Sequence, residues 1–416
     1  MNNFDKYKKL KTQYNLVYKG IHLNRVLSLM IWILANSKEA GFKWKTTAKI
    51  FFAMNVYRVD FKPNRHSILT MFGDWSRKEH LKIYGNIICK LGDCASYNEA
   101  LELGHKFYFS FSTIVNFIKS LWILRGAGLT FVQKWKLSVH ATYYCNTIDL
   151  LEKRNLCPQK FLCMCHGFGI DNLLTQYFKL KKIPTYSLQE GIYFLFGDNP
   201  PLDSILYENF ETDNLLCWGQ YTKDEYMKYG IEGKRLLVSG YPKDLSLSEV
   251  VIKPPLRKCL VLLARDSFNS SNLNLIDILS EFTKDFDFEL KLHPSCDFET
   301  YSKLALENGM SILSLDKSIN DCLNNIDYDF AIAVNTTVYY ESLIKGLPCL
   351  RFHDDAFILM AGLDDVFTNS QQFCIKLHVI QTIPEVEYQK HITELLEYAI
   401  GYGKDNYVKN VLGEFF

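Results

Sequence analysis

Two apolar segments of this sequence each end in small polar side chains that could bind a phosphate. The first segment, FELKL, is followed by His293 and Ser295, and the second, FAIAV, is followed by Thr336 and Thr337. In an open parallel sheet, ligands bind outside the carboxyl ends of the strands. Backbone N–H groups at a helix N-terminus bind anions, and neighbouring hydroxyls can add donors. We therefore expect these side chains to lie side by side and to form a cradle for a phosphate.

The sequence around these segments alternates between strand-like and helix-like patterns. The segment VYYESLIKG after Thr337 predicts a helix that ends at Gly346, with Pro348 beyond it. An earlier apolar run, CLVLLA, ends at Ala264, and the alternation continues from there to Phe352. This pattern predicts an α/β domain with a parallel sheet.

The first half of the chain repeats the pattern. The run SILTMF predicts the opening strand of a doubly wound domain. The run FLCMC is followed by His166 and Gly167, and the run IPTYSL is followed by Glu190 and Gly191. Ionisable side chains therefore stand at the ends of two further strands, beside glycines that allow a ligand to approach the backbone.

The order of these motifs resembles the nucleotide-binding half of GT-B glycosyltransferases. The shared marks are a strand that ends in His293-Pro294, and a hydroxyl pair that opens a helix carrying Glu341. The similarity is greatest to enzymes of bacterial surface glycans: the sialyltransferase and Kdo-transferase groups and the teichoic-acid glycerophosphotransferases. It covers residues 161–354. The resemblance implies an α/β protein of two Rossmann-like domains facing a central cleft, with an N-terminal helical extension.

The resemblance and the composition together divide the chain into four parts. The expected parts are a basic helical extension at 1–60, an acceptor-side Rossmann-like domain at 61–250, a nucleotide-sugar-binding Rossmann-like domain at 256–385, and C-terminal helices at 386–416. In GT-B proteins a C-terminal helix often crosses back to the first domain, and the last segment is expected to do the same.

The resemblance also implies roles for residues of the first domain. In these families an acidic residue or a histidine at the strand tip faces the acceptor hydroxyl, and here that position is Glu190. We expect Glu190 to be the general base, with His166 as the second candidate. The alternatives are a solvated loop carboxylate and a core histidine bonded to the backbone. The glycines expected to line the cleft are Gly167, Gly191 and Gly240.

On the donor side, the leaving nucleoside phosphate develops charge that must be stabilised, and His293 is the expected catalytic partner. The resemblance places the nucleotide along the strand tips of the second domain. The expected donor-binding residues are Arg265, Ser267, His293, Pro294, Ser295, Asn335, Thr336, Thr337, Glu341 and His353. No Asp-x-Asp motif stands at a strand tip. We therefore expect no metal and no cofactor, with a CMP- or UDP-linked sugar as the substrate.

Positive charge is concentrated at the start of the chain. Residues 1–65 contain 13 Lys or Arg and three acidic residues, although the net charge of the whole chain is only +1. Lys43, Lys45 and Lys49 are interspersed with aromatic residues. We expect this segment to contact an anionic membrane surface. The alternative is an ordinary amphipathic cap packed on a domain.

Two apolar stretches bear on location. The run VLSLMIWILA at 26–35 is too short to span a bilayer and has no cleavage site. The stretch 107–132 is longer but is interrupted by Lys119 and Arg125, so buried core is favoured over a monotopic membrane face. Twelve scattered cysteines without CxxC spacing are typical of a reducing cytoplasm. We therefore expect a cytoplasmic protein, peripheral on the inner face of a bacterial plasma membrane.

Together these features predict a metal-independent glycosyltransferase that moves a sugar from a nucleotide-activated donor to a hydroxyl of a growing surface glycan, such as capsule or lipopolysaccharide. One alternative is a sugar-nucleotide epimerase of the same fold, which would use similar carboxylates and histidines but would need no basic aromatic segment. Another is a non-catalytic scaffold for glycan assembly. The basic segment has no recognised nucleic-acid motif, so no nucleic-acid partner is expected.

Overall fold

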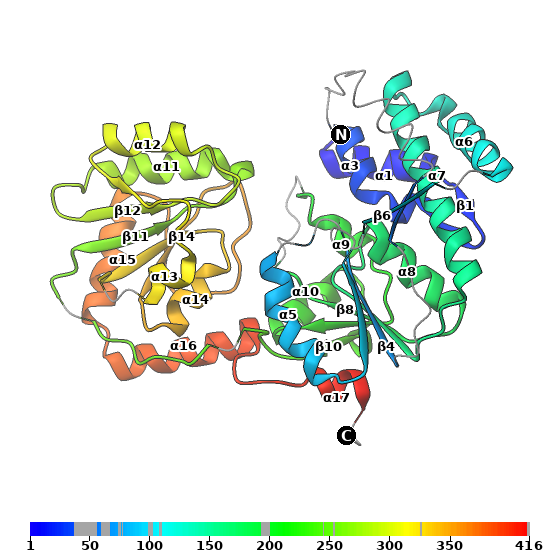
Figure 1. Ribbon diagram of the computed structural model, residues 1–416. Helices are drawn as coiled ribbons and strands as arrows, with labels where there is room; N and C mark the ends of the chain where they lie inside the picture. The colour runs from blue at the N-terminus through cyan, green and yellow to red at the C-terminus, as the bar shows by residue number, and fades with distance from the viewer. Residues whose placement is uncertain are drawn as a thin grey trace. The chain divides into compact units, whose positions relative to one another are not determined.

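The computed structural model describes residues 1–36, 56–59, 67–73, 76, 78–98, 103–107, 110–192, 200–243, 245–252, 254–324 and 327–413. The chain divides into two compact units (Figure 1). Unit 1 consists of Met1–Trp218, Lys223–Pro242 and Asp405–Phe416, and unit 2 consists of Gly219–Thr222 and Lys243–Lys404. The segment that carries Lys43, Lys45 and Lys49 lies outside the described residues, so its membrane contact stays a prediction.

Unit 1 is built on a six-stranded parallel sheet with the order β10-β9-β8-β7-β4-β5. Successive side chains of a strand point to opposite faces. In β4, Leu69 and Met71 belong to one apolar core, and Ile68 and Phe72 belong to another. Both faces are therefore buried, which explains the nearly continuous apolar runs. The strands are β4 (Ile68–Phe72), β5 (Cys94–Asn98), β7 (Lys160–Cys163), β8 (Thr185–Leu188), β9 (Asn214–Cys217) and β10 (Leu236–Val238).

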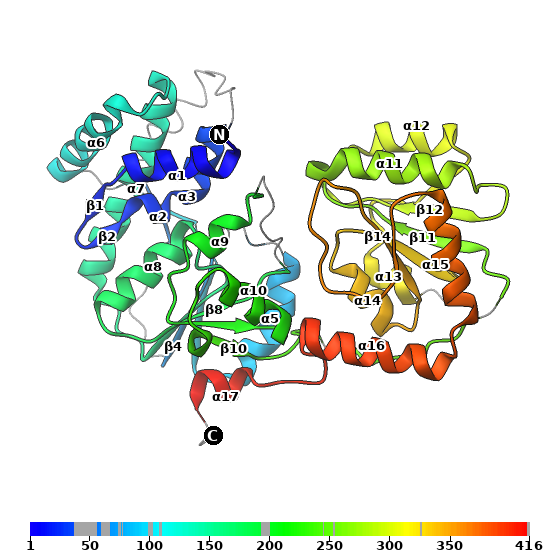
Figure 2. The ribbon, with the colours of Figure 1, turned by 180° about the vertical axis from the view of Figure 1, so that it is seen from behind.

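Helices cover both faces of this sheet, as the two opposite views show (Figures 1 and 2). Two antiparallel pairs complete the unit: β1 (Val17–Tyr18) with β2 (Ile21–His22), and β3 (Val56–Val59) with β6 (Leu103–Phe107). The helices of unit 1 are α1 (Asn3–Gln13), α2 (Leu23–Val26), α3 (Ser28–Asn36), α5 (Lys78–Lys90), α6 (Phe111–Ile123), η1 (Leu124–Gly126), α7 (Phe131–Arg154), α8 (Gly169–Leu180), α9 (Ser204–Glu208), η2 (Gly233–Arg235) and α17 (Tyr407–Leu412). Helix α10 (Gln220–Lys228) begins in unit 2 and ends in unit 1.

The first 36 residues are an integral part of unit 1. Ile31 is fully buried in the core that also contains β7. Lys11 forms an ion pair of 2.7 Å with Glu208, and Arg25 pairs with Glu211. Two of the cations of the basic N-terminal region are therefore used to attach α1 and α2 to the rest of the unit.

Unit 2 is a second six-stranded parallel sheet, with the order β13-β12-β11-β14-β15-β16. Its strands are β11 (Lys258–Leu262), β12 (Asp287–Lys291), β13 (Ser311–Ile312), β14 (Phe330–Val334), β15 (Cys349–Phe352) and β16 (Val366–Phe367). Its helices are η3 (Asp266–Phe268), α11 (Asn269–Ser280), α12 (Phe298–Glu307), α13 (Ile319–Asn324), α14 (Val338–Ile344), α15 (Ser370–Thr382) and α16 (Glu385–Ile400). Alternate residues of β11 and β14, such as Val261 and Ile332, join one core with α11, α12 and α15.

After α16 the chain returns to unit 1. The hydroxyl of Tyr407 in α17 donates to the carbonyl oxygen of Gly240 at 2.8 Å, and Tyr407 packs in the core formed by β4 and α5. The predicted α/β class, with two Rossmann-like parallel-sheet domains, is confirmed. Within the described part of the chain, no helix combines the length and the apolarity that crossing a membrane requires.

Candidate functional site

Most of the predicted donor-binding residues lie at the edge of the unit 2 sheet where the carboxyl ends of its strands are found. Strands β12, β11, β14 and β15 are adjacent and parallel, with Lys291 opposite Leu262 and Val334 opposite Phe352. Their carboxyl ends therefore lie along one edge. Strand β11 lies between β12 and β14, so the prediction that the tips of these two strands are side by side is wrong. The residues that follow these ends are His293–Ser295 after β12, Arg265–Ser267 after β11, Asn335–Thr337 after β14 and His353 after β15.

The first contact at this edge joins the tips of β12 and β11. The Nδ1 atom of His293 accepts a hydrogen bond from the backbone N–H of Ser295 at 3.1 Å and lies 2.8 Å from the Ser295 hydroxyl. That hydroxyl oxygen accepts from the backbone N–H of Asp266 at 3.0 Å. Because a backbone N–H can only donate, Nδ1 must be the acceptor, and a neutral His293 carries its proton on Nε2. The half-buried ring thus presents Nε2–H as a donor, and Pro294 is exposed beside it.

A second chain of contacts joins the tips of β11 and β15. The guanidinium of Arg265 lies 5.5 Å from the ring centre of Phe268, and Phe268 packs edge-on against Phe357. The Nε2 atom of His353 donates to the carbonyl oxygen of Phe357 at 2.8 Å. His353 therefore has its ring orientation fixed, while Ser267 is exposed in η3. An arginine with aromatic rings can stack against a flat base, which agrees with a nucleotide site.

Asn335 is the most unusual residue of this edge. It follows β14 directly, its φ angle is +43°, and only 7% of its surface is exposed. Within the described structure, neither the oxygen nor the nitrogen of its side-chain amide has a hydrogen-bond partner. Buried amides are normally satisfied, and left-handed residues cluster at functional sites, so this position is suited to a polar ligand. Thr336 and Thr337 follow it, half-buried, as the chain enters α14.

Glu341 is placed differently from the other predicted donor residues. Its carboxylate is 3% exposed and forms an ion pair of 2.7 Å with Lys243. Both residues belong to unit 2, so the pair attaches the segment that enters the unit to α14. Breaking a buried pair costs stability. This arrangement favours a structural role for Glu341 over direct contact with a donor.

In unit 1, Glu190 stands at the carboxyl end of β8 beside a histidine from another element. The Nε2 atom of His80, in α5, lies 3.8 Å from Oε1 of Glu190. The His80 side chain is 4% exposed, and that of Glu190 is 26% exposed. A carboxylate that is partly open to solvent and backed by an imidazole can accept a proton and share it with its neighbour.

The backbone around Glu190 is held by three side-chain contacts. The backbone N–H of Trp218 donates to the Gln189 side-chain oxygen at 2.7 Å, and the side-chain amide of Gln189 donates to the carbonyl oxygen of Gly191 at 2.9 Å. The hydroxyl of Tyr84 donates to the carbonyl oxygen of Gln189. Burial raises the pKa of Tyr84, and the charge of Glu190 raises that pKa further. These contacts fix the position of the strand tip that carries Glu190.

The three predicted cleft glycines occupy different environments. At Gly191 an added Cβ would meet no atom of the structure within 4 Å, as expected where a ligand approaches the backbone. Gly240 has φ +104°, which favours glycine, and its carbonyl is bonded by Tyr407. At Gly167, by contrast, a Cβ would lie 2.5 Å from Leu206. Gly167 therefore packs against Leu206 in the interior of unit 1, in contrast to the expectation that it lines a cleft.

His166, the second candidate base, is also an interior residue. Its ring is 2% exposed, and Nε2 donates to the carbonyl oxygen of Leu206 at 2.9 Å. Phe210 packs edge-on against the ring at 4.8 Å. Burial lowers the pKa of His166 to about 4. A buried, neutral imidazole bonded to the backbone is poorly placed to meet an acceptor hydroxyl, so the structure favours the core role for His166 and Glu190 as the base.

The low pKa of His166 predicts a pH dependence of stability. The unfolded chain binds this proton with a pKa near 6.5 and the folded chain with a pKa of about 4. The stabilisation is therefore complete above pH 6.5 and is lost as the pH falls toward 4, by on the order of 3 kcal/mol. We expect His166→Phe to flatten this part of the pH profile, measured by urea unfolding of parent and variant. Parallel pH profiles for the two proteins would contradict the buried neutral histidine.

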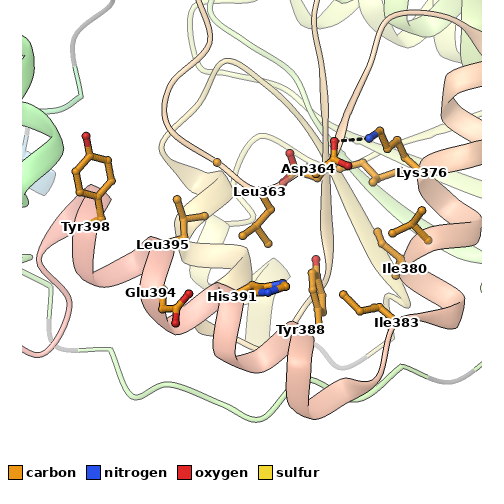
Figure 3. Close-up of a pocket in the computed structure, with 14 residues that line it drawn as sticks. Leu363, Asp364, Lys376, Ile380, Ile383, Tyr388, His391, Glu394, Leu395 and Tyr398 are labelled. Carbon is orange, nitrogen blue, oxygen red and sulfur yellow. Dashed lines mark hydrogen bonds and ion pairs between the residues drawn. The ribbon is translucent and has the colours of Figure 1, made fainter.

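One cavity of the described structure lies away from these residues. A pocket of about 530 Å³ is formed by the segment before β16 and by α15 and α16. Figure 3 shows Tyr388, His391 and Ile380 directed toward a common space, with the ion pair of Asp364 and Lys376 at one side. None of the predicted site residues lines this pocket. The chemistry of the strand tips, rather than cavity volume, therefore defines the candidate site.

Comparison with known proteins bears on the fold. No protein-family model and no curated protein sequence matches this chain. Among solved structures, the UDP-GlcNAc 2-epimerase of Methanocaldococcus jannaschii in complex with UDP-GlcNAc and UDP aligns with 83% of this chain and 98% of its own, at 12% identity and a TM-score of 0.50. This chain has the GT-B fold.

Two further structures align over the same shares of both chains, 83% and 98%. The lipopolysaccharide outer core galactosyltransferase WaaB, in its apo form, is 14% identical with a TM-score of 0.49. The UDP-GlcNAc 2-epimerase of Neisseria meningitidis bound to UDP-GlcNAc is 13% identical with a TM-score of 0.47. At sequence identities this low, structural similarity is evidence about the fold alone and gives no information about the reaction.

His80 and Lys243 are the residues of these two edges that sequence reasoning missed. His80 lies 110 positions before Glu190, and Lys243 lies 98 positions before Glu341. The spacing of residues within a local motif cannot predict contacts between positions so far apart in the sequence. The signals that could have identified them are weak: a histidine early in the helix after the first strand of a doubly wound domain, and a lysine directly after the G-x-P turn.

Among the described residues, no group of three or more His, Cys, Asp or Glu side chains could hold a metal ion.

Proposed function

We propose that this protein is a glycosyltransferase that moves a sugar from a nucleotide-activated donor to a hydroxyl of a bacterial surface glycan, without a metal. The observation that carries the proposal is the carboxyl edge of the unit 2 sheet, where Nε2–H of His293 follows β12 and the unsatisfied amide of Asn335 follows β14, with β11 between the two strands. Such groups suit the phosphates of a nucleotide. The base–ribose half would lie toward Arg265 and His353.

The proposed reaction requires a base that accepts the proton of the acceptor hydroxyl, and groups that stabilise the charge on the leaving phosphate. The acceptor hydroxyl attacks the anomeric carbon, a new C–O bond forms, and the bond from that carbon to the donor phosphate oxygen breaks. Glu190 takes the hydroxyl proton, with His80 beside it at 3.8 Å. The charge that develops on the leaving phosphate is stabilised by hydrogen bonds from His293, Asn335 and the hydroxyls of Thr336 and Thr337.

The proposed donor is a UDP- or CMP-linked sugar. UDP-GlcNAc and UDP are the ligands of the structural neighbour from Methanocaldococcus jannaschii, which supports testing UDP-linked sugars first. The His-Pro strand end and the hydroxyl pair resemble enzymes that use CMP-linked acidic sugars. No further cofactor is proposed.

Thermal unfolding in the presence of CMP-, UDP-, GDP- and CDP-linked sugars tests the proposal. A ligand that binds only the folded state raises its stability by about 2.7 kcal/mol at a hundredfold excess over Kd. We expect one nucleotide class to raise Tm. A protein whose Tm responds to none of them would contradict the donor site. Incubating the stabilising donor without any acceptor then separates the reactions, because an epimerase converts the donor by itself and a glycosyltransferase does not transfer.

Asn335 provides a second test through a matched pair of variants. Asn335→Gly and Asn335→Ala both delete the amide, but only glycine tolerates the observed φ of +43° without strain. We expect the glycine variant to be about 1–2 kcal/mol more stable than the alanine variant. Both should bind the donor about tenfold or more weakly than the parent, because each has lost the same polar group. Chemical denaturation and donor titration measure the two effects, and unchanged donor affinity would remove Asn335 from the site.

A further inference from the structure

Helix α6 of unit 1 has the reverse of the usual amphipathic pattern. In most surface helices the apolar stripe faces the core and the polar residues face water. In α6 the residues buried against the rest of unit 1 are Thr113, Asn116 and Ser120. These three recur at helical spacing and therefore lie on one face.

The polar face of α6 is held by specific hydrogen bonds. The Thr113 hydroxyl donates to the Asn146 side-chain oxygen of α7 at 3.1 Å. The Ser120 hydroxyl donates to that of Ser138 at 2.8 Å and lies 2.8 Å from the hydroxyl of Tyr14. The orientation of the helix is thus fixed by polar contacts, and rotating α6 to bury its apolar residues would break them.

The opposite face of α6 is strongly apolar and exposed, so the expectation that the stretch 107–132 is buried core is wrong for this helix. Its side chains share the spacing of one helical stripe and have 40–80% of their surface exposed: Phe111, Ile114, Val115, Ile118 and Trp122. Phe131, at the start of α7, is 70% exposed as well. A contiguous apolar stripe of this kind marks a surface that contacts something other than water. Figures 1 and 2 both show α6 at the periphery of unit 1, with α7 on its inner side.

The charges around this stripe indicate what it contacts. Between residues 103 and 148 the sequence has five Lys or Arg and no Asp or Glu. Two of these cations, Lys119 and Arg125, are exposed on or next to α6. A second copy of the chain is a poor occupant, because a two-fold interface places the same patch opposite itself and would bring these cations together. Apolar side chains, a tryptophan and two exposed cations on α6 and the turn that follows it suit the headgroup region of an anionic bilayer.

We propose that α6 lies in the surface of an anionic lipid bilayer, with the stripe Phe111–Trp122 inserted and Lys119 and Arg125 on lipid phosphates. The helix has 13 residues and is about 20 Å long, which suits a position in the plane of the surface. In the sequence, α6 is a different segment from the one with Lys43, Lys45 and Lys49. It would place the acceptor-side unit at the membrane and thereby favour a lipid-linked acceptor, a consequence that rests on the proposed function.

Flotation with vesicles tests the surface directly. We expect the full chain to bind vesicles of equal parts phosphatidylcholine and phosphatidylglycerol, and to bind pure phosphatidylcholine more weakly. Ile118→Ser with Trp122→Ser should reduce partitioning at least about tenfold, because two inserted apolar side chains are lost. The matched control is Leu306→Ser with Val386→Ser, which removes two apolar residues of unit 2 that are even more exposed than Ile118 and Trp122. This control should partition like the parent.

Further readouts separate the alternatives. Lys119→Glu with Arg125→Glu should abolish the preference for phosphatidylglycerol, and raising the salt concentration should weaken binding in the parent. Brominated lipids should quench tryptophan fluorescence less in Trp122→Phe than in the parent.

Unchanged partitioning of the Ile118/Trp122 variant would overturn the proposal. A parent that is dimeric and does not bind vesicles, with a monomeric Ile118/Trp122 variant, would also overturn it. Binding should persist in Glu190→Gln, so failure here is distinguishable from failure of the proposed reaction.

Discussion

Glu190→Gln is expected to fold normally, bind the donor with near-parent affinity, and transfer sugar at least about 100-fold more slowly than the parent. The glutamine keeps the size and hydrogen bonding of the side chain but cannot accept the hydroxyl proton. Because the contacts of Gln189 with Tyr84 and Trp218 hold the strand tip, the substitution should not displace the backbone. Initial rates at saturating donor, with Tm as the check on folding, measure the effect.

The control for this substitution is Glu232→Gln. Glu232 is an exposed carboxylate of the same unit, where its side chain pairs with Lys234 at 2.8 Å. The Glu232→Gln variant should transfer sugar at the same rate as the parent protein. A Glu190→Gln protein with parent turnover would end the assignment of Glu190 as the base. Loss of donor binding in that variant would instead make Glu190 a nucleotide contact.

His293→Ala is expected to raise the barrier for transfer by about 2–4 kcal/mol, a loss of roughly 30- to 1000-fold in kcat. The reason is the loss of the Nε2–H donor, whose direction is set when Nδ1 accepts from the backbone of Ser295. The effect should fall mainly on kcat, since the developing phosphate charge is larger in the transition state than in the bound donor. Thr336→Val and Thr337→Val should each cost less than His293→Ala.

The matched control for His293 is His391→Ala, which removes an exposed histidine of α16 that lies in the separate pocket shown in Figure 3. It should leave transfer unchanged. Ser295→Ala is the positioning test: it deletes the hydroxyl between His293 and Asp266 but keeps the backbone N–H that fixes the tautomer. A folded His293→Ala protein with full activity would show that the phosphate binds elsewhere.

The sequence by itself determined the sheet-and-helix plan of this protein. Apolar runs such as SILTMF and FAIAV predict strands because both faces of these sheets are covered, so every side chain of the run is buried. The alternation of strands with helices then requires parallel strands whose carboxyl ends share an edge. For that reason His293, Asn335 and His353 could be assigned to one edge of the sheet, although the sequence did not predict that β11 separates the first from the other two.

Tertiary structure alone decided which of the ionisable side chains are available for chemistry. His166 and Glu190 follow neighbouring strands, yet α9 covers the first, and the second stays partly open beside His80. Glu341 was expected at the donor and is paired with Lys243, a partner 98 positions away. The inverted pattern of α6 likewise depends on α7 supplying Asn146 and Ser138 to its polar face. The spacing of apolar residues in a local segment predicts whether it forms a helix or a strand. The burial of a side chain and its hydrogen-bond partners depend on segments far apart in the chain, and local spacing carries no information about them.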